Sequence, residues 1–130
     1  MDRDCVLIVD DDEDIRDTLS ELVEMAGCSA LVAANGVEAL EVLKHQHPQL
    51  IILDLRMPVM DGAELLKVMR TEPALATIDV VISTSLPSEA PIGVPVMPKP
   101  INIDTMWDWM RRTCRCTIPE AWAGPAGRRR

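Results

Sequence analysis

The chain has 130 residues, which is enough for one domain with a hydrophobic core of its own. Its net charge of -8 argues against binding to nucleic acid or to anionic membranes, so we expect neither as a partner. No apolar run approaches the roughly 18 residues of a membrane span, and the N-terminus lacks the pattern of a signal peptide. We therefore expect a cytoplasmic protein.

Short apolar runs alternate along the chain with segments that carry apolar residues at helical spacing. We expect strands at 5–9, 29–33, 50–53, 79–83 and 94–97. We expect helices at 14–26, from Val37 to a stop before Pro48, at 63–70, and from Asn102 or Asp104 to about Cys114. This alternation favours an α/β fold with a doubly wound, five-stranded parallel sheet.

The alternation breaks between the fourth and fifth predicted strands. Residues 86–98 contain four prolines in thirteen residues, which leaves no room for a regular helix. We therefore expect the helix of this connection, the fourth of the doubly wound pattern, to be shortened or absent.

The end of the chain has a different composition. We expect residues 117–130, rich in Pro, Gly and Arg, to form a flexible tail, so that residues 1–116 make up the domain. Cys5 and Cys28 lie in apolar surroundings and are expected to pack as small hydrophobic side chains. Cys114 and Cys116 supply only two of the roughly four ligands of a structural zinc, so a metal or disulfide there is the weaker reading.

Four of the predicted strands end at polar residues suited to phosphoryl transfer. Ligands of an open parallel sheet gather outside the carboxyl ends of its strands, so these side chains are expected to meet at one edge. They are Asp10 and Asp11 after the first strand, Asp54 after the third, Thr84 after the fourth and Lys99 after the fifth.

Asp54 is the candidate nucleophile, because a carboxylate can attack phosphorus and hold the phosphoryl group as an acyl phosphate. Mg²⁺ prefers one or two carboxylates and keeps several waters, so Asp10 and Asp11 are candidate ligands, directly or through water. Lys99 and Thr84 are placed to contact phosphoryl oxygens. Three converging carboxylates repel one another strongly, a cost that a chain rarely carries without a cation.

The acids that follow have a simpler interpretation. Asp12, Glu13 and Asp14 are expected to cap the next helix and to occupy its first turn. Asp10-x-Asp12 also fits the motif of a haloacid dehalogenase-type phosphohydrolase, although Asp14 stands where that motif has threonine.

A longer motif makes the chain resemble a known family. Residues 54–62 read D-x-x-M-P-x-M-D-G, and this block occurs together with the acid pair, Thr84 and Lys99-Pro100. Over residues 4–114 the chain resembles the receiver domain of two-component response regulators, the family that includes the single-domain chemotaxis receiver. The resemblance implies a flavodoxin-like sheet with the strand order 2-1-3-4-5.

The resemblance also implies a role for each site residue. Asp54 would accept a phosphoryl group from a histidine kinase or a histidine phosphotransfer protein, in a self-catalysed transfer followed by slow autodephosphorylation, with no other enzymatic activity. The implied Mg²⁺ ligands are Asp11, Asp54 and the backbone carbonyl of Arg56, with Asp10 acting through water. Thr84 would be the switch hydroxyl, Lys99 would bind the phosphoryl group, and the bond before Pro100 would be cis.

Some features depart from the family pattern. The chain has no Tyr or Phe, so Val96 stands where the fifth strand usually carries an aromatic switch residue, and Ser85 stands where Ala or Gly is favoured. Only about sixteen residues follow the last predicted helix, which predicts a stand-alone regulator that signals to an unknown target by protein contact. The alternative is a phosphorylation-independent, receiver-like interaction module.

Overall fold

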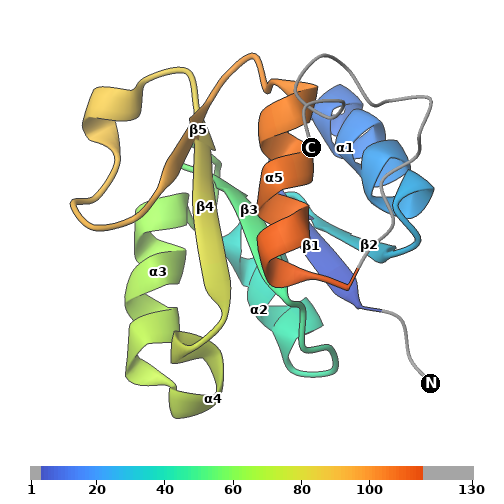
Figure 1. The fold of residues 1–130 in the computed structure, drawn as a ribbon. Helices are drawn as coiled ribbons and strands as arrows, with labels where there is room; N and C mark the ends of the chain where they lie inside the picture. Colours follow the sequence, from blue (N-terminus) through green and yellow to red (C-terminus); the bar gives the residue numbers. More distant parts are fainter. Residues whose placement is uncertain (1–3, 116–130) are drawn as a thin grey trace.

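Five parallel strands form one sheet in the order β2-β1-β3-β4-β5 (Figure 1). The computed structural model describes residues 4–115. The strands are β1 (Cys5–Val9), β2 (Ser29–Ala33), β3 (Leu50–Asp54), β4 (Asp79–Thr84) and β5 (Val96–Pro98). This is the predicted doubly wound, flavodoxin-like order. Within residues 4–115, no helix has the length and apolar character needed to cross a bilayer.

Helices cover both faces of the sheet (Figure 1). One face packs against α1 (Glu13–Met25) and α5 (Ile103–Thr113), and the other against α2 (Gly36–Leu43) and α3 (Gly62–Thr71). Successive side chains of a strand point to opposite faces, so Ile8 enters the first core and Leu7 the second. Strands β1 and β3 are buried along their whole length, which holds their carboxyl ends in fixed positions.

Local signals in the sequence set both ends of α1. Asp12 is its N-cap and accepts hydrogen bonds from the backbone N–H groups of Asp14 and Ile15, as predicted for this acid. At the other end Gly27 adopts a φ of 84°, a left-handed conformation that glycine tolerates without strain. The N–H groups of Gly27 and Cys28 then donate to the carbonyls of Glu24 and Val23, which closes a Schellman motif.

The β4–β5 connection contains no α-helix. It holds only η1 (Pro87–Glu89), a short 3₁₀ turn, in agreement with the prediction from its prolines. Strand β5 pairs with β4 from Val96 onward, opposite Ile82, so it begins two residues later than the predicted 94. The four-residue helix α4 (Pro73–Ala76), which precedes β4, is not predicted from the sequence.

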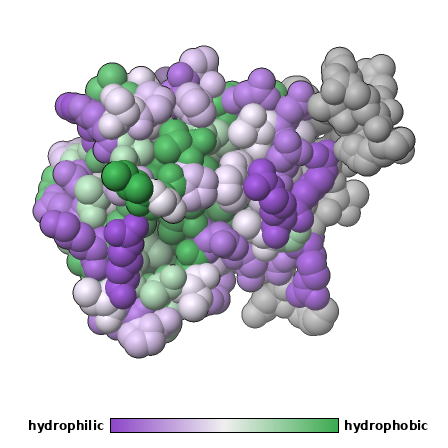
Figure 2. All heavy atoms as spheres, turned by 60° about the vertical axis from the view of Figure 1, so that its left-hand side comes forward, coloured by the Kyte–Doolittle hydropathy of each residue, from purple (hydrophilic) through white to green (hydrophobic). Residues whose placement is uncertain are grey.

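Because the β4–β5 connection contains no α-helix, apolar surface is left on the side of α3 and η1. Figure 2 looks onto this side and shows an apolar area with polar residues around it. Val80, Val94 and Val96 are only partly buried, and Ile92 is fully exposed.

The cysteines of the described region are buried. Cys28 packs among apolar side chains, as predicted, and Cys114 lies in the same core, while Cys5 is buried in β1. Burial raises the pKa of the thiols of Cys5 and Cys114, so these two side chains are poorly reactive at neutral pH. Cys116 and the predicted tail at 117–130 lie outside the described residues.

Two glycines at equivalent helix positions allow a matched test of close packing. A Cβ atom on Gly62, the first residue of α3, would overlap the backbone carbonyl oxygen of Asp54, whereas one on Gly36, the first residue of α2, would meet the side chain of Met60. We predict that Gly62→Ala destabilises the fold by about 1–3 kcal/mol more than Gly36→Ala, because a backbone cannot move aside as a side chain can. Equal losses in urea denaturation would contradict this.

Candidate functional site

Three carboxylates meet at the carboxyl ends of β1 and β3. One oxygen each from Asp10, Asp11 and Asp54 lie within 4.8 Å of one another. Asp10 and Asp54 are buried, with 3% and 7% of their surface exposed, whereas Asp11 is exposed. The predicted convergence of these side chains is therefore observed.

Lys99 faces this cluster from the loop after β5. Its Nζ lies 2.8 Å from Oδ2 of Asp10 and 3.5 Å from Oδ1 of Asp54. The backbone fixes this position, because the N–H of Lys99 donates to the carbonyl of Thr84 at 2.9 Å. The Lys99–Pro100 peptide bond is cis, which is the isomer implied by the resemblance. The ammonium group thus bridges the two buried carboxylates.

Nearby donors hold the acids in place. The N–H of Asp12 donates to Oδ1 of Asp10 at 2.9 Å, and Nη1 of Arg16 donates to the backbone carbonyl of Asp10 at 2.7 Å. The backbone N–H of Arg56 favours the ionised carboxylate of Asp54 and so lowers its pKa. Asp12 itself caps α1 and is not part of the cluster, so the pairing of Asp10 with Asp12 that a phosphohydrolase needs is not formed.

The environment opposes ionisation of Asp54. Burial raises the pKa of Asp54, and the negative charge of Asp10 raises it further, while Lys99 and the N–H of Arg56 only partly offset these effects. Burial alone would lower the pKa of Lys99, but its hydrogen bond to Asp10 and the charges of Asp10 and Asp54 outweigh this and raise it. Lys99 is therefore cationic at neutral pH, and the cluster keeps an excess of negative charge.

The cluster fits a hard divalent cation. Carboxylate oxygens are the ligands that Mg²⁺ prefers, and Mg²⁺ needs only one or two of them besides water. An exposed Asp11 beside two buried acids leaves one side of the cluster open for such an ion and its waters. Arg56, whose backbone carbonyl is the further predicted ligand, is the second residue of the loop after β3.

Thr84 ends β4 at the same edge of the sheet. Its neighbour Ser83 pairs in register with Asp54, and Thr84 itself is buried. Its Oγ1 accepts a hydrogen bond from the N–H of Leu86 at 3.0 Å. The hydroxyl of Thr84 is thus linked to the segment that leads into η1. Ser85, the next residue, is exposed to solvent.

The D-x-x-M-P-x-M-D-G segment forms a tightly wound loop between β3 and α3. Met60 donates to the carbonyl of Pro58 at 2.8 Å across Val59, whose φ of 71° is strained for a β-branched residue. Asp61 then caps α3 in a reciprocal capping box with Glu64. The loop returns to β3 where the N–H of Gly62 donates to the carbonyl of Leu55 at 3.0 Å.

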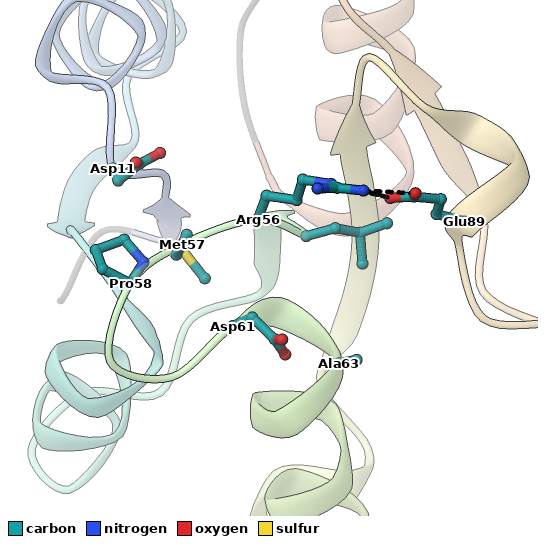
Figure 3. Close-up of a pocket in the computed structure, with 8 residues that line it drawn as sticks. Asp11, Arg56, Met57, Pro58, Asp61, Ala63 and Glu89 are labelled. Carbon is teal, nitrogen blue, oxygen red and sulfur yellow. Dashed lines mark hydrogen bonds and ion pairs between the residues drawn. The ribbon is translucent and has the colours of Figure 1, made fainter.

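An ion pair that the sequence does not reveal lies at the rim of the site. Nε and Nη2 of Arg56 donate to the carboxylate of Glu89 in η1, at distances of 2.6 to 3.0 Å. The two residues line a cavity of about 600 Å³ that also borders Asp11, as Figure 3 shows. They are 33 positions apart, and Glu89 lies in a proline-rich connection without periodicity, so no sequence signal links them.

Comparison with known proteins identifies the family. The family model of the response regulator receiver domain matches residues 6–93. The chain belongs to this family, as its site and sheet order predict. Its structure is similar to that of the chemotaxis response regulator CheY4 of Vibrio cholerae, with a TM-score of 0.76 and 29% sequence identity. The alignment covers 85% of this chain and 98% of the CheY4 chain.

Other relatives support the same family. The signal receiver domain of a signal transduction histidine kinase from Syntrophus aciditrophicus aligns with a TM-score of 0.76 and 28% identity, over 85% of this chain and 89% of that one. Response regulator MprA of Mycobacterium avium is 32% identical over 120 residues, which is 88% of this chain and 53% of MprA. The chain thus spans about half the length of the curated relatives it matches.

We predict that Asp54→Asn stabilises the metal-free protein at neutral pH by about 1 kcal/mol, or roughly 4 °C in Tm, because it removes a buried charge from beside Asp10. The raised pKa of Asp54 gives the sign: the ionised carboxylate costs stability above the folded-state pKa, and this cost vanishes as the pH falls through that value. Thermal melts at several pH values should show the gain shrinking in acid. A gain that is constant with pH would contradict the prediction.

We predict the opposite effect for Lys99→Met. Without the ammonium group, Asp10 and Asp54 face each other in a buried position with no cation between them, which should destabilise the metal-free fold by about 2–3 kcal/mol. Added Mg²⁺ should recover part of this loss, because it binds only the folded cluster. Thermal melts with and without Mg²⁺ measure both effects, and a variant as stable as wild type would refute the proposed charge balance.

Proposed function

We propose that this chain is a phosphorelay receiver that accepts a phosphoryl group on Asp54 from a histidine kinase or a histidine phosphotransfer protein. The observation that carries the proposal is the buried Asp54 carboxylate beside Asp10 and Asp11, with the Lys99 ammonium 3.5 Å away. This combines a nucleophile, oxygen ligands for a cation and a fixed positive charge in one place.

The residues divide the work of the proposed transfer. A carboxylate oxygen of Asp54 forms a bond to phosphorus while the phosphorus–nitrogen bond of the donor histidine breaks. Bound Mg²⁺ would supply neutralisation of the charge on the phosphoryl oxygens. Asp11 and Asp54 and the carbonyl of Arg56 are the proposed ligands, and Asp10 acts through water. Lys99 and the hydroxyl of Thr84 would then hold the transferred group.

The donor protein would dock beside α1. An apolar groove of about 540 Å³ runs between α1 and residues 99–103, and its lining includes Ile15, Leu22 and Met25. Lys99 also lines the groove, so a protein held there would lie next to Asp54. This supports α1 as the surface that selects the donor.

The proposed output is a change in protein contacts. The chain would catalyse only its own phosphorylation and a slow autodephosphorylation, and the cytoplasm is its proposed place of action. The apolar surface near η1 supports contact with a protein target whose identity the site does not specify.

The direct test is phosphorylation with a small donor. Wild-type protein incubated with Mg²⁺ and acetyl phosphate should gain one phosphoryl group, which peptide mapping after borohydride reduction should assign to Asp54. Asp54→Asn should gain none, and Asp12→Asn, which changes a neighbouring acid that caps α1, should behave like wild type. No labelling of wild type, or equal labelling of Asp54→Asn, would overturn the proposal.

The second candidate is a phosphorylation-independent interaction module. It is favoured by the β4–β5 connection, which contains no α-helix, and by the partly exposed side chains of Val94 and Val96 next to it. It predicts that wild type and Asp54→Ala bind the target equally well. The receiver proposal predicts that acetyl phosphate changes target binding by wild type alone.

A further inference from the structure

The ion pair between Arg56 and Glu89 has no part in the chemistry described so far. Arg56 follows Asp54 by two residues, and its backbone N–H favours the ionised form of the Asp54 carboxylate. Its side chain lines the cavity and extends toward Glu89 and away from Asp11, as Figure 3 shows. A cation therefore lines the cavity that borders Asp11, and it is paired with Glu89, which is not part of the carboxylate cluster.

The charge of the site changes when Asp54 is phosphorylated. With all three acids ionised, Lys99 and a bound dication together balance the three carboxylates. An acyl phosphate carries about one negative charge more than the carboxylate it replaces. Among the described residues that line the cavity, Arg56 is the cation available to balance this additional charge.

The contact that holds Arg56 is one that a phosphoryl group can displace. The side chains of Arg56 and Glu89 are 69% and 44% exposed, and exposed ion pairs contribute little net stability. A phosphoryl group in a partly buried site offers the same fork of N–H donors a doubly charged acceptor with matching geometry. Exchange of the carboxylate for the phosphoryl group is therefore favourable.

We propose that Arg56 is an additional ligand of the phosphoryl group on Asp54, and that Glu89 holds its guanidinium in reserve until that group arrives. This inference rests on the proposed phosphorylation of Asp54. Glu89 competes with the phosphoryl group for Arg56, so it weakens the phosphorylated state.

The exchange also reaches the output side. Glu89 lies in η1, and the Arg56–Glu89 pair is a side-chain link between η1 and the loop after β3. Loss of this pair would free η1 from that loop, next to the apolar surface described above. Phosphorylation of Asp54 would thereby change the contacts of the β4–β5 connection through Arg56. This route does not need an aromatic residue in β5, where this chain has Val96.

The inference is tested by the affinity for beryllofluoride in the presence of Mg²⁺, measured by isothermal titration calorimetry. Arg56→Ala should weaken binding about tenfold, because a charge-assisted hydrogen bond to the anion is lost. Glu89→Gln should tighten binding roughly threefold, because Arg56 no longer has a competing carboxylate. When Glu89→Gln is combined with Arg56→Ala, it should cause no further change in affinity. As a single variant, Arg56→Lys should bind more tightly than Arg56→Ala, because it keeps a positive charge.

A matched control separates this exchange from a general change in charge. Glu41→Gln removes an exposed carboxylate that pairs with Lys44 on α2, and it should leave the affinity unchanged. Wild-type affinity in Arg56→Ala, or an effect of Glu89→Gln that persists without Arg56 or equals that of Glu41→Gln, would overturn the inference. If wild type itself fails to bind beryllofluoride, or binds no better than Asp54→Asn, the proposed function fails first, and this outcome is distinct from the others.

Discussion

The central constraint on this structure is the repulsion among three carboxylates that lie at one edge of the sheet. The ammonium group of Lys99 offsets part of this repulsion. Asp10 and Asp54 are held at the ends of β1 and β3, whose residues are buried on both faces and cannot shift to separate them. Lys99 reaches both acids from the loop after β5, which lies on the far side of β4 from β3. Packing of the apolar core therefore stabilises a charge arrangement that is unfavourable by itself.

The surrounding loops serve this arrangement. Gly62 allows α3 to begin directly against the carbonyl of Asp54, and the positive φ of Val59 turns the loop tightly enough to bring it there. The backbone hydrogen bond from Lys99 to Thr84 ties the lysine to the neighbouring strand end. Strain and close approach are concentrated where the acids must be held, as is common near functional sites.

The β4–β5 connection is where this receiver domain departs from the pattern that the resemblance to its family implies. A 3₁₀ turn replaces a helix between β4 and β5, and apolar side chains such as Ile92 reach solvent. Within residues 4–115, this segment contacts residues beside the acidic cluster through the hydrogen bond from Leu86 to Thr84 and through the ion pair of Glu89 with Arg56.

The sequence by itself determined the doubly wound parallel α/β class, the convergence of Asp10, Asp11 and Asp54, and the loss of the helix in residues 86–98, while the strand order came from the resemblance to a family. These features follow from local causes: apolar runs that end in acids, the geometry of parallel strands, and prolines that exclude a helix. Only the tertiary structure decided that β5 begins at Val96, that a short α4 precedes β4, and that Arg56 pairs with Glu89. Prolines exclude a helix but do not choose a strand register, and contact between residues 33 positions apart depends on how the whole sheet places their loops.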